Sequence, residues 1–378
     1  MNISKLQQYF IKYLRLILNK SGLRRKRTVV FCAPADFHFQ HLLPIIKMIE
    51  GTPHLKLIIV EQPDWQQKPD IKNSVFILGK DLGKMNWNFF DVMIGTDFSS
   101  IPWWFTSGTR IALFHGAGPK VGFLEELAEN IFDVVFTPGP DLRELEEKII
   151  ENTKGRNTKL LQIGLPALDI LFHQGQKNEI QRKNNKPVIL YAPSWHLETS
   201  YIVIDEAFIR ELAGQNKYHI IVRPHPNLLI PEKCGGIDWE KILFSYENEN
   251  FEIPLQGSIY DYLHRCEAII GDYSSVLYEY LVFERPGFLY VSQEVLDKVL
   301  SYGACEPDSD AIIEPLCAAY QTIPDATMLL EILDKGMQKP DIRQNARIEL
   351  LNRTFYNAGS ATQVASREII RLLDFNRI

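Results

Sequence analysis

Residues 271–280 read GDYSSVLYEY and follow a short, mainly apolar run at residues 267–270. An apolar strand that stops at Gly-Asp, presents two hydroxyls and then starts a helix can hold an anion. The first-turn amides of a helix have no partner within it and carry partial positive charge. We expect Ser274 or Ser275 to be the N-cap of this helix. Because Asp-x-Ser-Ser can also cap a helix that binds nothing, a functional interpretation needs support from the rest of the chain.

Short apolar runs alternate with helical patterns on both sides of this stretch, as is typical of parallel sheets covered by helices on both faces. The runs that predict strands are residues 28–34, 55–61, 74–79, 91–95, 110–116, 133–139, 187–195, 218–226, 242–247, 267–272 and 286–292. The patterns that predict helices are residues 38–50, 122–130, 141–150, 259–265, 276–283 and 360–373. A chain of 378 residues is long enough for two domains. We therefore predict an α/β protein with two doubly wound, Rossmann-like domains.

The polar stretch at residues 174–186 has no apolar periodicity and is the best candidate for a linker. We expect an N-terminal domain at residues 28–180, a C-terminal domain at residues 186–358 and a final helix at residues 359–378. In such sheets, ligands bind at the loops that follow the carboxyl ends of the strands. Two domains of this kind that face each other would form a cleft, so candidate site residues should directly follow predicted strands.

The net charge of −6 is unevenly distributed along the chain. Residues 1–27 contain eight Lys and Arg residues and no acid, so the remainder carries a charge of −14. An acidic body argues against a nucleic-acid partner, whereas the basic segment favours an anionic surface. The apolar residues of this segment recur at helical spacing, which predicts an amphipathic helix in a membrane interface, with a helix packed on the protein's own body as the alternative. We expect a cytoplasmic protein that is peripheral on the inner face of the cell membrane.

Several classes of protein are excluded by composition. The five cysteines are odd in number, widely spaced and without a C-x-x-C pair, which is typical of reduced cytosolic thiols. No apolar run approaches the roughly 20 residues that cross a bilayer. A Walker loop, a serine nucleophile elbow and a cluster of metal ligands are all lacking. We expect neither a cofactor nor a metal site.

Two further motifs follow predicted strands. The segment VRPHP holds Arg223 and His225 between prolines that restrict the backbone. Both side chains can donate to phosphate oxygens, and together with the serine pair they could hold a diphosphate. The segment FHGAGPK contains His115, which could accept a proton near neutral pH, and Gly116, which lets a substrate approach closely. A single histidine after a strand is often structural, and VRPHP could be a surface turn.

The motifs resemble those of a known family. FHGAGPK, LPALD (165–169), ILYAPSW (189–195), VRPHP, GDYSSVLYEY and YNAGSA (356–361) occur in the order and approximate spacing of the CDP-glycerol glycerophosphotransferases of teichoic acid and capsule synthesis. The resemblance spans about residues 110–375. It implies a glycosyltransferase B fold with an acceptor-side domain, then a domain that binds the CDP-activated donor, then a helix that crosses back.

The resemblance also implies roles for individual residues. His115 would be the general base, and Glu279 would approach the ribose or polyol of the donor. The remaining donor segments map to Arg223, His225, Asp272, Ser274 and Ser275. We expect His115 and His225 to be catalytic, and Gly116 to lie at the donor. The sequence departs from the family pattern at two places where the acceptor or the donor group would be recognised. The family's H-G-T-P becomes HGAGP here, so the threonine is lost and the proline is displaced to Pro119, and the basic residue after the family's Y-A-P-T-W is His196.

The function implied is transfer of a polyol phosphate, most simply glycerol phosphate, from a CDP-activated donor to a hydroxyl of a lipid-linked or growing surface glycan, with release of CMP. The alternative on the same fold is a glycosyltransferase or epimerase-like enzyme that uses a nucleotide sugar, because a fold does not fix a function. A third hypothesis is a non-catalytic, membrane-bound protein that binds glycans. The products separate these hypotheses, since only the first forms a new phosphodiester.

Overall fold

The computed structural model describes residues 27–61, 65, 68–79, 81, 90–96, 108–118, 132–152, 158–175, 180, 182–195, 204–272, 274–291 and 310–375. The chain divides into two compact units, the first made of residues 1–170 and 354–378 and the second of residues 171–353. The basic segment predicted as a helix at residues 1–27 lies outside the described residues, apart from Arg27, as does the helix predicted at residues 122–130.

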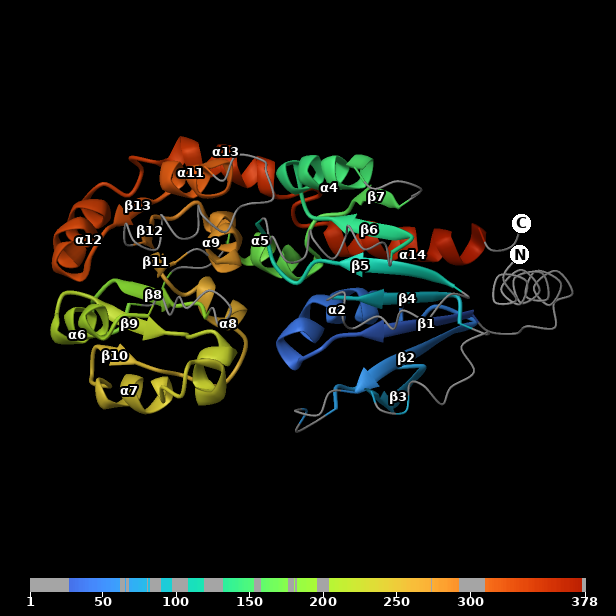
Figure 1. Cartoon of the computed structure of the whole chain (residues 1–378), viewed down its shortest axis with the longest axis horizontal. Coiled ribbons are helices and arrows are strands. Elements are labelled where there is room, and N and C mark those ends of the chain that lie inside the picture. The colour runs from blue at the N-terminus through green and yellow to red at the C-terminus, as the bar shows by residue number, and fades with distance from the viewer. Residues whose placement is uncertain are drawn as a thin grey trace, which may run out of the picture. The chain divides into compact units, whose positions relative to one another are not determined.

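The described strands of the first unit form one parallel sheet in the order β3-β2-β1-β4-β5-β6-β7 (Figure 1). They are β1 (Arg27–Cys32), β2 (Leu55–Glu61), β3 (Ser74–Leu78), β4 (Val92–Gly95), β5 (Thr109–Leu113), β6 (Val134–Thr137) and β7 (Lys159–Gln162). From β1, in the middle of the sheet, the chain runs outward through β2 and β3 and returns to the other side of β1 at β4. This reversal of direction beside β1 is the topological switch point at which doubly wound sheets bind ligands.

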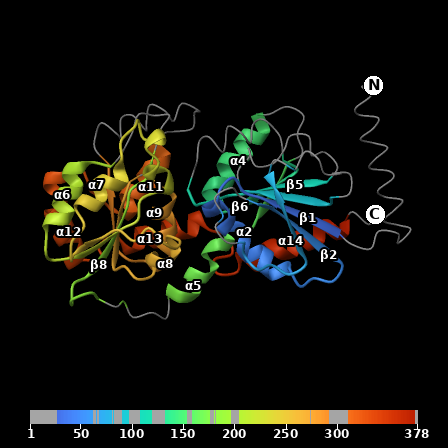
Figure 2. The same cartoon turned by 90° about the horizontal axis from the view of Figure 1, so that it is seen from below.

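Helices of the first unit cover its sheet. Their bounds are α2 (Asp36–Ile49), α4 (Pro140–Asn152), the 3₁₀ turn η4 (Pro166–Leu168), α5 (Asp169–Gly175), which continues into the second unit, and α14 (Ala361–Phe375). α2 and α14 pack against each other and share one hydrophobic core with the strands (Figure 2). Leu42 and Ile45 of α2 and Ile369 of α14 have no exposed surface in this core. The helix predicted at residues 360–373 is therefore present and completes the first unit.

Two of the family-like segments hold the last helix in place. Asp169, at the end of LPALD, accepts hydrogen bonds from the backbone amides of Ala361 (3.0 Å) and Thr362 (2.7 Å) and so satisfies the first turn of α14. Asn357, in YNAGSA, donates from its side chain to the carbonyls of Gln162 (2.8 Å) and Ile163 (3.1 Å). The two motifs are distant in sequence, and their shared role is structural.

The second unit is built on a second parallel sheet, whose described strands have the order β10-β9-β8-β11-β12-β13. They are β8 (Val188–Ala192), β9 (His219–Val222), β10 (Phe251–Glu252), β11 (Ala268–Gly271), β12 (Gly287–Tyr290) and β13 (Gln321–Ile323). The α-helices are α6 (Glu206–Gly214), α7 (Trp239–Ser245), α8 (Tyr260–Leu263), α9 (Ser275–Tyr280), α11 (Asp310–Ala319), α12 (Leu329–Gln338) and α13 (Gln344–Thr354). The 3₁₀ turns are η5 (Pro226–Leu229), η6 (Pro231–Lys233), η7 (Leu281–Phe283) and η8 (Ala326–Met328).

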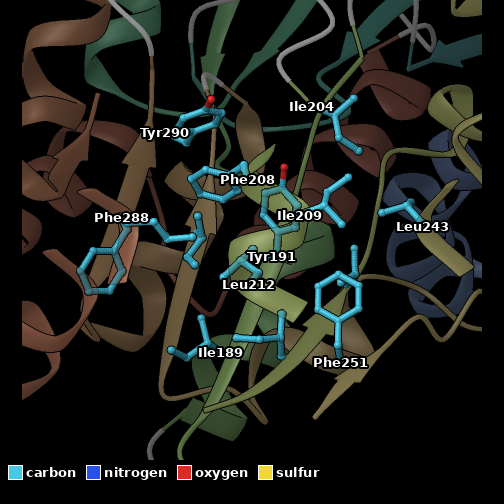
Figure 3. Close-up of a cluster of buried hydrophobic side chains, with 14 of the residues drawn as sticks. Ile189, Tyr191, Ile204, Phe208, Ile209, Leu212, Leu243, Phe251, Phe288 and Tyr290 are labelled. Atoms are coloured by element: carbon cyan, nitrogen blue, oxygen red, sulfur yellow. The ribbon is translucent and has the colours of Figure 1, made fainter. Parts of the chain in front are cut away.

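A core of aromatic and aliphatic side chains supports this second sheet (Figure 3). The ring of Phe208 lies between those of Tyr191 and Tyr290, with centroid distances of 5.4 and 4.0 Å. Close aromatic packing of this kind adds to the free energy gained from burial alone. β8, which carries Tyr191, is therefore anchored immediately before the loop at its carboxyl end.

One predicted strand is wrong, and three observed strands were not predicted. Residues 242–247 were expected as a strand but belong largely to α7. Asp238 caps that helix by accepting from the amide of Lys241 (3.0 Å), and the buried Trp239 and Leu243 stand four residues apart on one face. The edge strand is instead β10. β10 and the other two unpredicted strands, β7 and β13, are short, and each contains polar as well as apolar residues.

No helix in the described ranges has the length and apolar character needed to span a bilayer.

Candidate functional site

The loops after β9, β8 and β11 lie side by side at the carboxyl edge of the second sheet. The amide of Arg223 donates to the carbonyl of Tyr191 (2.8 Å), and that of His225 donates to the carbonyl of Pro193 (3.0 Å). Asp272, with 2% of its surface exposed, accepts from the amide of Ser194 (2.7 Å). These bonds bring together VRPHP, APSW and GD, three of the motifs identified from the sequence.

Ser274 is the N-cap of α9, in agreement with the prediction that either Ser274 or Ser275 caps this helix. Its backbone is extended (φ −144°, ψ 157°), but its hydroxyl makes no capping hydrogen bond to the first turn. The hydroxyl oxygen is buried and has no hydrogen-bond partner within the described part of the chain. Ser275 is the first helical residue. The first turn of α9 is thus not closed by its own cap side chain, which is the condition in which an anion could satisfy it.

Hydrogen bonds from the core hold α9 in position. The hydroxyl of Tyr280 donates to the carbonyl of Cys266 (2.8 Å), and the hydroxyl of Tyr320 donates to the carbonyl of Leu277 (2.7 Å). Glu279, predicted at the ribose or polyol, has only 3% of its surface exposed and hydrogen-bonds the hydroxyl of Tyr260. Burial, followed by the charge of this carboxylate, raises the pKa of Tyr260. In this structure Glu279 therefore contributes to the support of α9.

The ring of His225 is held in one tautomer. Its Nδ1 accepts a hydrogen bond from the amide of Asn227 (3.1 Å), which makes His225 the cap of η5. An accepting Nδ1 carries no proton, so the neutral ring is protonated at Nε2. The ring also lies 5.6 Å from that of Trp195, between centroids. His225 can therefore donate a hydrogen bond from Nε2 without first being charged.

Arg223 turns its guanidinium toward backbone carbonyls. Nη1 donates to the carbonyls of Pro254 and Gln256 (3.2 Å to the latter), and Nη2 donates to the carbonyl of Gly257 (2.6 Å). The guanidinium also lies 4.9 Å from the ring centroid of Tyr262. Burial lowers the pKa of Arg223. The usual pKa of arginine is so high that the side chain still stays cationic. Arg223 thus fixes the turn after β10, and a phosphate contact from this residue stays a prediction.

His115 lies in the first unit, two residues after the end of β5. Its half-buried ring makes a 2.7 Å hydrogen bond from Nδ1 to the carbonyl of Thr96, which follows β4. A carbonyl only accepts, so Nδ1 carries the proton and the neutral ring has its lone pair on Nε2. This tautomer is the opposite of that of His225. Gly116, which was expected at the donor, is buried beside His115, and Gly118 has a φ of 86°, a value that favours glycine.

Two histidines that the motifs did not include surround His115. His38 and His41, both on α2, are 8% and 5% exposed, and their ring centroids lie 4.1 and 6.5 Å from that of His115. Among the described residues, no group of three or more His, Cys, Asp or Glu side chains has an arrangement that could hold a metal ion. The only sequence signal for His38 and His41 is their separation by three residues, which places them on one face of the predicted helix.

Comparisons with known proteins agree with the motifs. Residues 143–295 match the family model for CDP-glycerol:poly(glycerophosphate) glycerophosphotransferase. A ribitol-phosphate polymerase of teichoic acid from Staphylococcus aureus, TarL, is 21% identical over 51% of this chain and 37% of its own length. A teichoic acid glycerol-phosphate primase from Bacillus subtilis is 26% identical over 36% of this chain and 34% of its own length. The chain thus matches well under half of the length of these curated relatives.

Solved structures share the fold. The wall teichoic acid polymerase TagF superimposes with a TM-score of 0.64 at 17% identity, over 99% of each chain. A putative UDP-N-acetylglucosamine 2-epimerase from Listeria monocytogenes gives a TM-score of 0.56 at 13% identity, over 93% of this chain and 97% of that one. The prediction of two Rossmann-like domains with parallel sheets is confirmed by these neighbours and by the sheet order.

Proposed function

Because the chain is related through residues 143–295 to the CDP-glycerol:poly(glycerophosphate) glycerophosphotransferases, as its motifs predicted, we propose that it transfers a polyol phosphate from a CDP-activated donor. Glycerol phosphate is the proposed group, and a hydroxyl of a growing teichoic acid-like or capsule polymer, or of a lipid-linked glycan, is the proposed acceptor. One observation at the carboxyl edge of the second sheet supports the proposal. His225 offers an Nε2–H donor there, and α9 begins there without a side-chain cap.

The proposed reaction is an attack by the acceptor hydroxyl on the outer phosphorus of the donor. A new phosphodiester bond forms, the bond between this phosphorus and the bridging oxygen breaks, and CMP leaves with that oxygen. His115 takes the hydroxyl proton on Nε2, since its Nδ1 is committed to Thr96. His225 donates from Nε2 to an oxygen of the diphosphate, and the first-turn amides of α9 stabilise the charge that builds there. Asp272 and Arg223 keep the loops that carry these donors in place.

A binding experiment with two matched variants tests the donor site. His225→Gln keeps an N–H near the position of Nε2, whereas His225→Asn keeps an acceptor for the Asn227 amide and removes that donor. Calorimetric titration with CDP-glycerol, CDP-ribitol, CMP and UDP-N-acetylglucosamine should show selective binding of a CDP-polyol that is largely retained in His225→Gln and weakened about tenfold in His225→Asn. Preference of the wild-type protein for the UDP-sugar would instead favour a nucleotide-sugar enzyme.

We also propose that residues 1–27, with eight basic residues and no acid, bring the protein to an anionic membrane, at the inner face of the cell membrane. Each basic residue near such a surface contributes about 1 kcal/mol. Flotation with vesicles that contain phosphatidylglycerol should recover the full chain but not a chain that starts at Thr28, and raised salt should reduce the recovery. Equal recovery of both chains would exclude this segment as the anchor.

A further inference from the structure

We infer that His38 is a positioning residue for His115, whose ring it holds in the orientation in which Nε2 receives the acceptor proton. The inference rests on the proposed function, because it concerns the residue proposed there as the general base. It adds to that function a residue from outside every motif that pointed to it.

His38 and His41 are nearly buried, and both of their rings lie close to the ring of His115. His38 and His41 are three residues apart, so they lie on the same face of α2. The planes of His38 and His115 are inclined by 39° at a centroid distance of 4.1 Å, and His41 meets His115 nearly edge to face, at 75° and 6.5 Å. Histidine is not a typical core residue, so two nearly buried histidines directed toward a half-buried third indicate a role beyond filling space.

The topology of the first sheet explains how this cluster forms. β1, β4 and β5 are neighbours in the sheet and all run parallel. α2 begins four residues after β1, Thr96 directly follows β4, and His115 follows β5. The parts of the cluster thus come from three adjacent strand ends. They meet beside the switch point between β1 and β4, where a doubly wound sheet binds its ligand.

Two contacts together fix the His115 ring. The hydrogen bond from Nδ1 to Thr96 restrains rotation of the ring about the Cβ–Cγ bond, but coupled changes of χ1 and χ2 can still tilt the ring. The ring of His38 lies in a tilted contact with that of His115, at a centroid distance of 4.1 Å and an angle of 39°, and limits this movement. His38 is itself contacted by Phe37, edge to face, at 4.1 Å and 63°. With the hydrogen bond at Nδ1 and the ring contact from His38, the proposed base holds Nε2 in a single direction, as efficient proton transfer requires.

Three variants separate ring contact from other effects. His38→Leu removes the planar contact and keeps an apolar side chain of similar reach. His38→Phe restores a planar ring that cannot carry a proton, so it should preserve the position of His115. His173→Leu changes an exposed histidine of α5 and serves as the control. If His38→Leu does not fold, as judged by circular dichroism, His38→Gln takes its place.

The first measurement is turnover of CDP-glycerol, followed by CMP release. We expect His38→Leu to lower kcat about tenfold with the KM for CDP-glycerol unchanged, and His38→Phe to restore kcat to within about twofold of the wild type. The control should behave as the wild type. Equal losses in His38→Leu and His38→Phe, or no loss in either, would overturn the inference.

The second measurement does not require activity. In full-length protein with ¹⁵N-labelled histidine, the wild-type His115 should show an unprotonated Nε2, assigned by its loss in His115→Asn. His38→Leu should give a mixture of tautomers, because the ring leaves Thr96 part of the time, and His38→Phe should keep the wild-type signal. Wild-type protein that shows this signal but releases no CMP would refute the proposed function alone. An unchanged signal in His38→Leu would refute the positioning role alone.

Discussion

Glu146, on α4, is an acid with no exposed surface, and its surroundings give it a pH-dependent contribution to the stability of the first unit. Its Oε2 accepts a 2.6 Å hydrogen bond from the hydroxyl of Thr137, while Oε1 is buried with no hydrogen-bond partner in the described ranges. Burial raises the pKa of Glu146 from 4.5 to about 8, and the bond from Thr137 opposes this only in part. We therefore expect the side chain to be mostly neutral in the folded protein at pH 7.

The raised pKa makes the fold less stable as the pH increases. Between pH 4.5 and about 8, the folded chain keeps a proton that the unfolded chain has lost, so the free energy of unfolding falls across this window. The full shift is worth about 5 kcal/mol. Glu146→Gln cannot ionise, but it leaves an amide nitrogen without a partner, at a cost of about 1 to 3 kcal/mol. We expect the variant to be about 1 kcal/mol less stable than the wild type at pH 5 and about 2 to 4 kcal/mol more stable at pH 8.5.

Thermal unfolding between pH 5 and 9 measures this crossover. For a unit of this size, 1 kcal/mol moves Tm by about 2 to 4 °C, so the difference between the two proteins should change sign and reach several degrees at pH 8.5. Glu144→Gln, on the same helix with its side chain 70% exposed, is the control and should shift stability by less than about 0.5 kcal/mol. A difference between wild type and Glu146→Gln that stays constant with pH would show that this carboxyl does not titrate as inferred.

Three further predictions follow from the contacts. His115→Asn keeps an N–H toward Thr96 but removes the proposed base, so kcat should fall by about 10² to 10⁴ while calorimetric binding of the donor persists; unchanged turnover would remove His115 from the proposed mechanism. Arg223→Lys cannot reach all three carbonyls of the turn at residues 254–257, and donor affinity should fall about tenfold in titration, whereas undiminished affinity would separate that turn from the site. Asp169→Ala removes the cap of α14 and should cost about 1 kcal/mol in urea unfolding, with no loss expected if solvent replaces it.

Strong apolar runs predicted the central strands of both sheets. A strand that is buried on both faces has a nearly continuous apolar sequence, which is easy to recognise. The failures lie at the sheet edges, where this signal fades. β7 and β13 are short and partly polar, and residues 242–247 have apolar content that fits a strand or a helix equally well. There the cap at Asp238 decided the outcome, and capping is a local signal that periodicity does not capture.

The candidate site was predicted in part. The sequence showed which residues follow strands, and the order of the motifs resembled that of the CDP-glycerol glycerophosphotransferases. It did not show that Arg223 would turn to the carbonyls of a neighbouring loop, since side-chain direction depends on a turn 31 or more residues away. Nor did it show His38, which meets His115 only because β1, β4 and β5 are neighbours in the sheet, although the two histidines are far apart in the chain. The strand order that creates this contact is a property of the fold.

The attachment of α14 to the first unit has a consequence for biosynthesis. Residues 171–353 form one continuous unit, whereas the first unit requires residues on both sides of it. A ribosome makes the chain from its N-terminus, and domains fold as their segments emerge. The second unit can therefore reach its native structure while the first still waits for Asp169 to meet the amides of Ala361 and Thr362. During that interval, the apolar face of α2 that α14 later covers is accessible to chaperones. The first unit is therefore the first to be translated but the last to be completed.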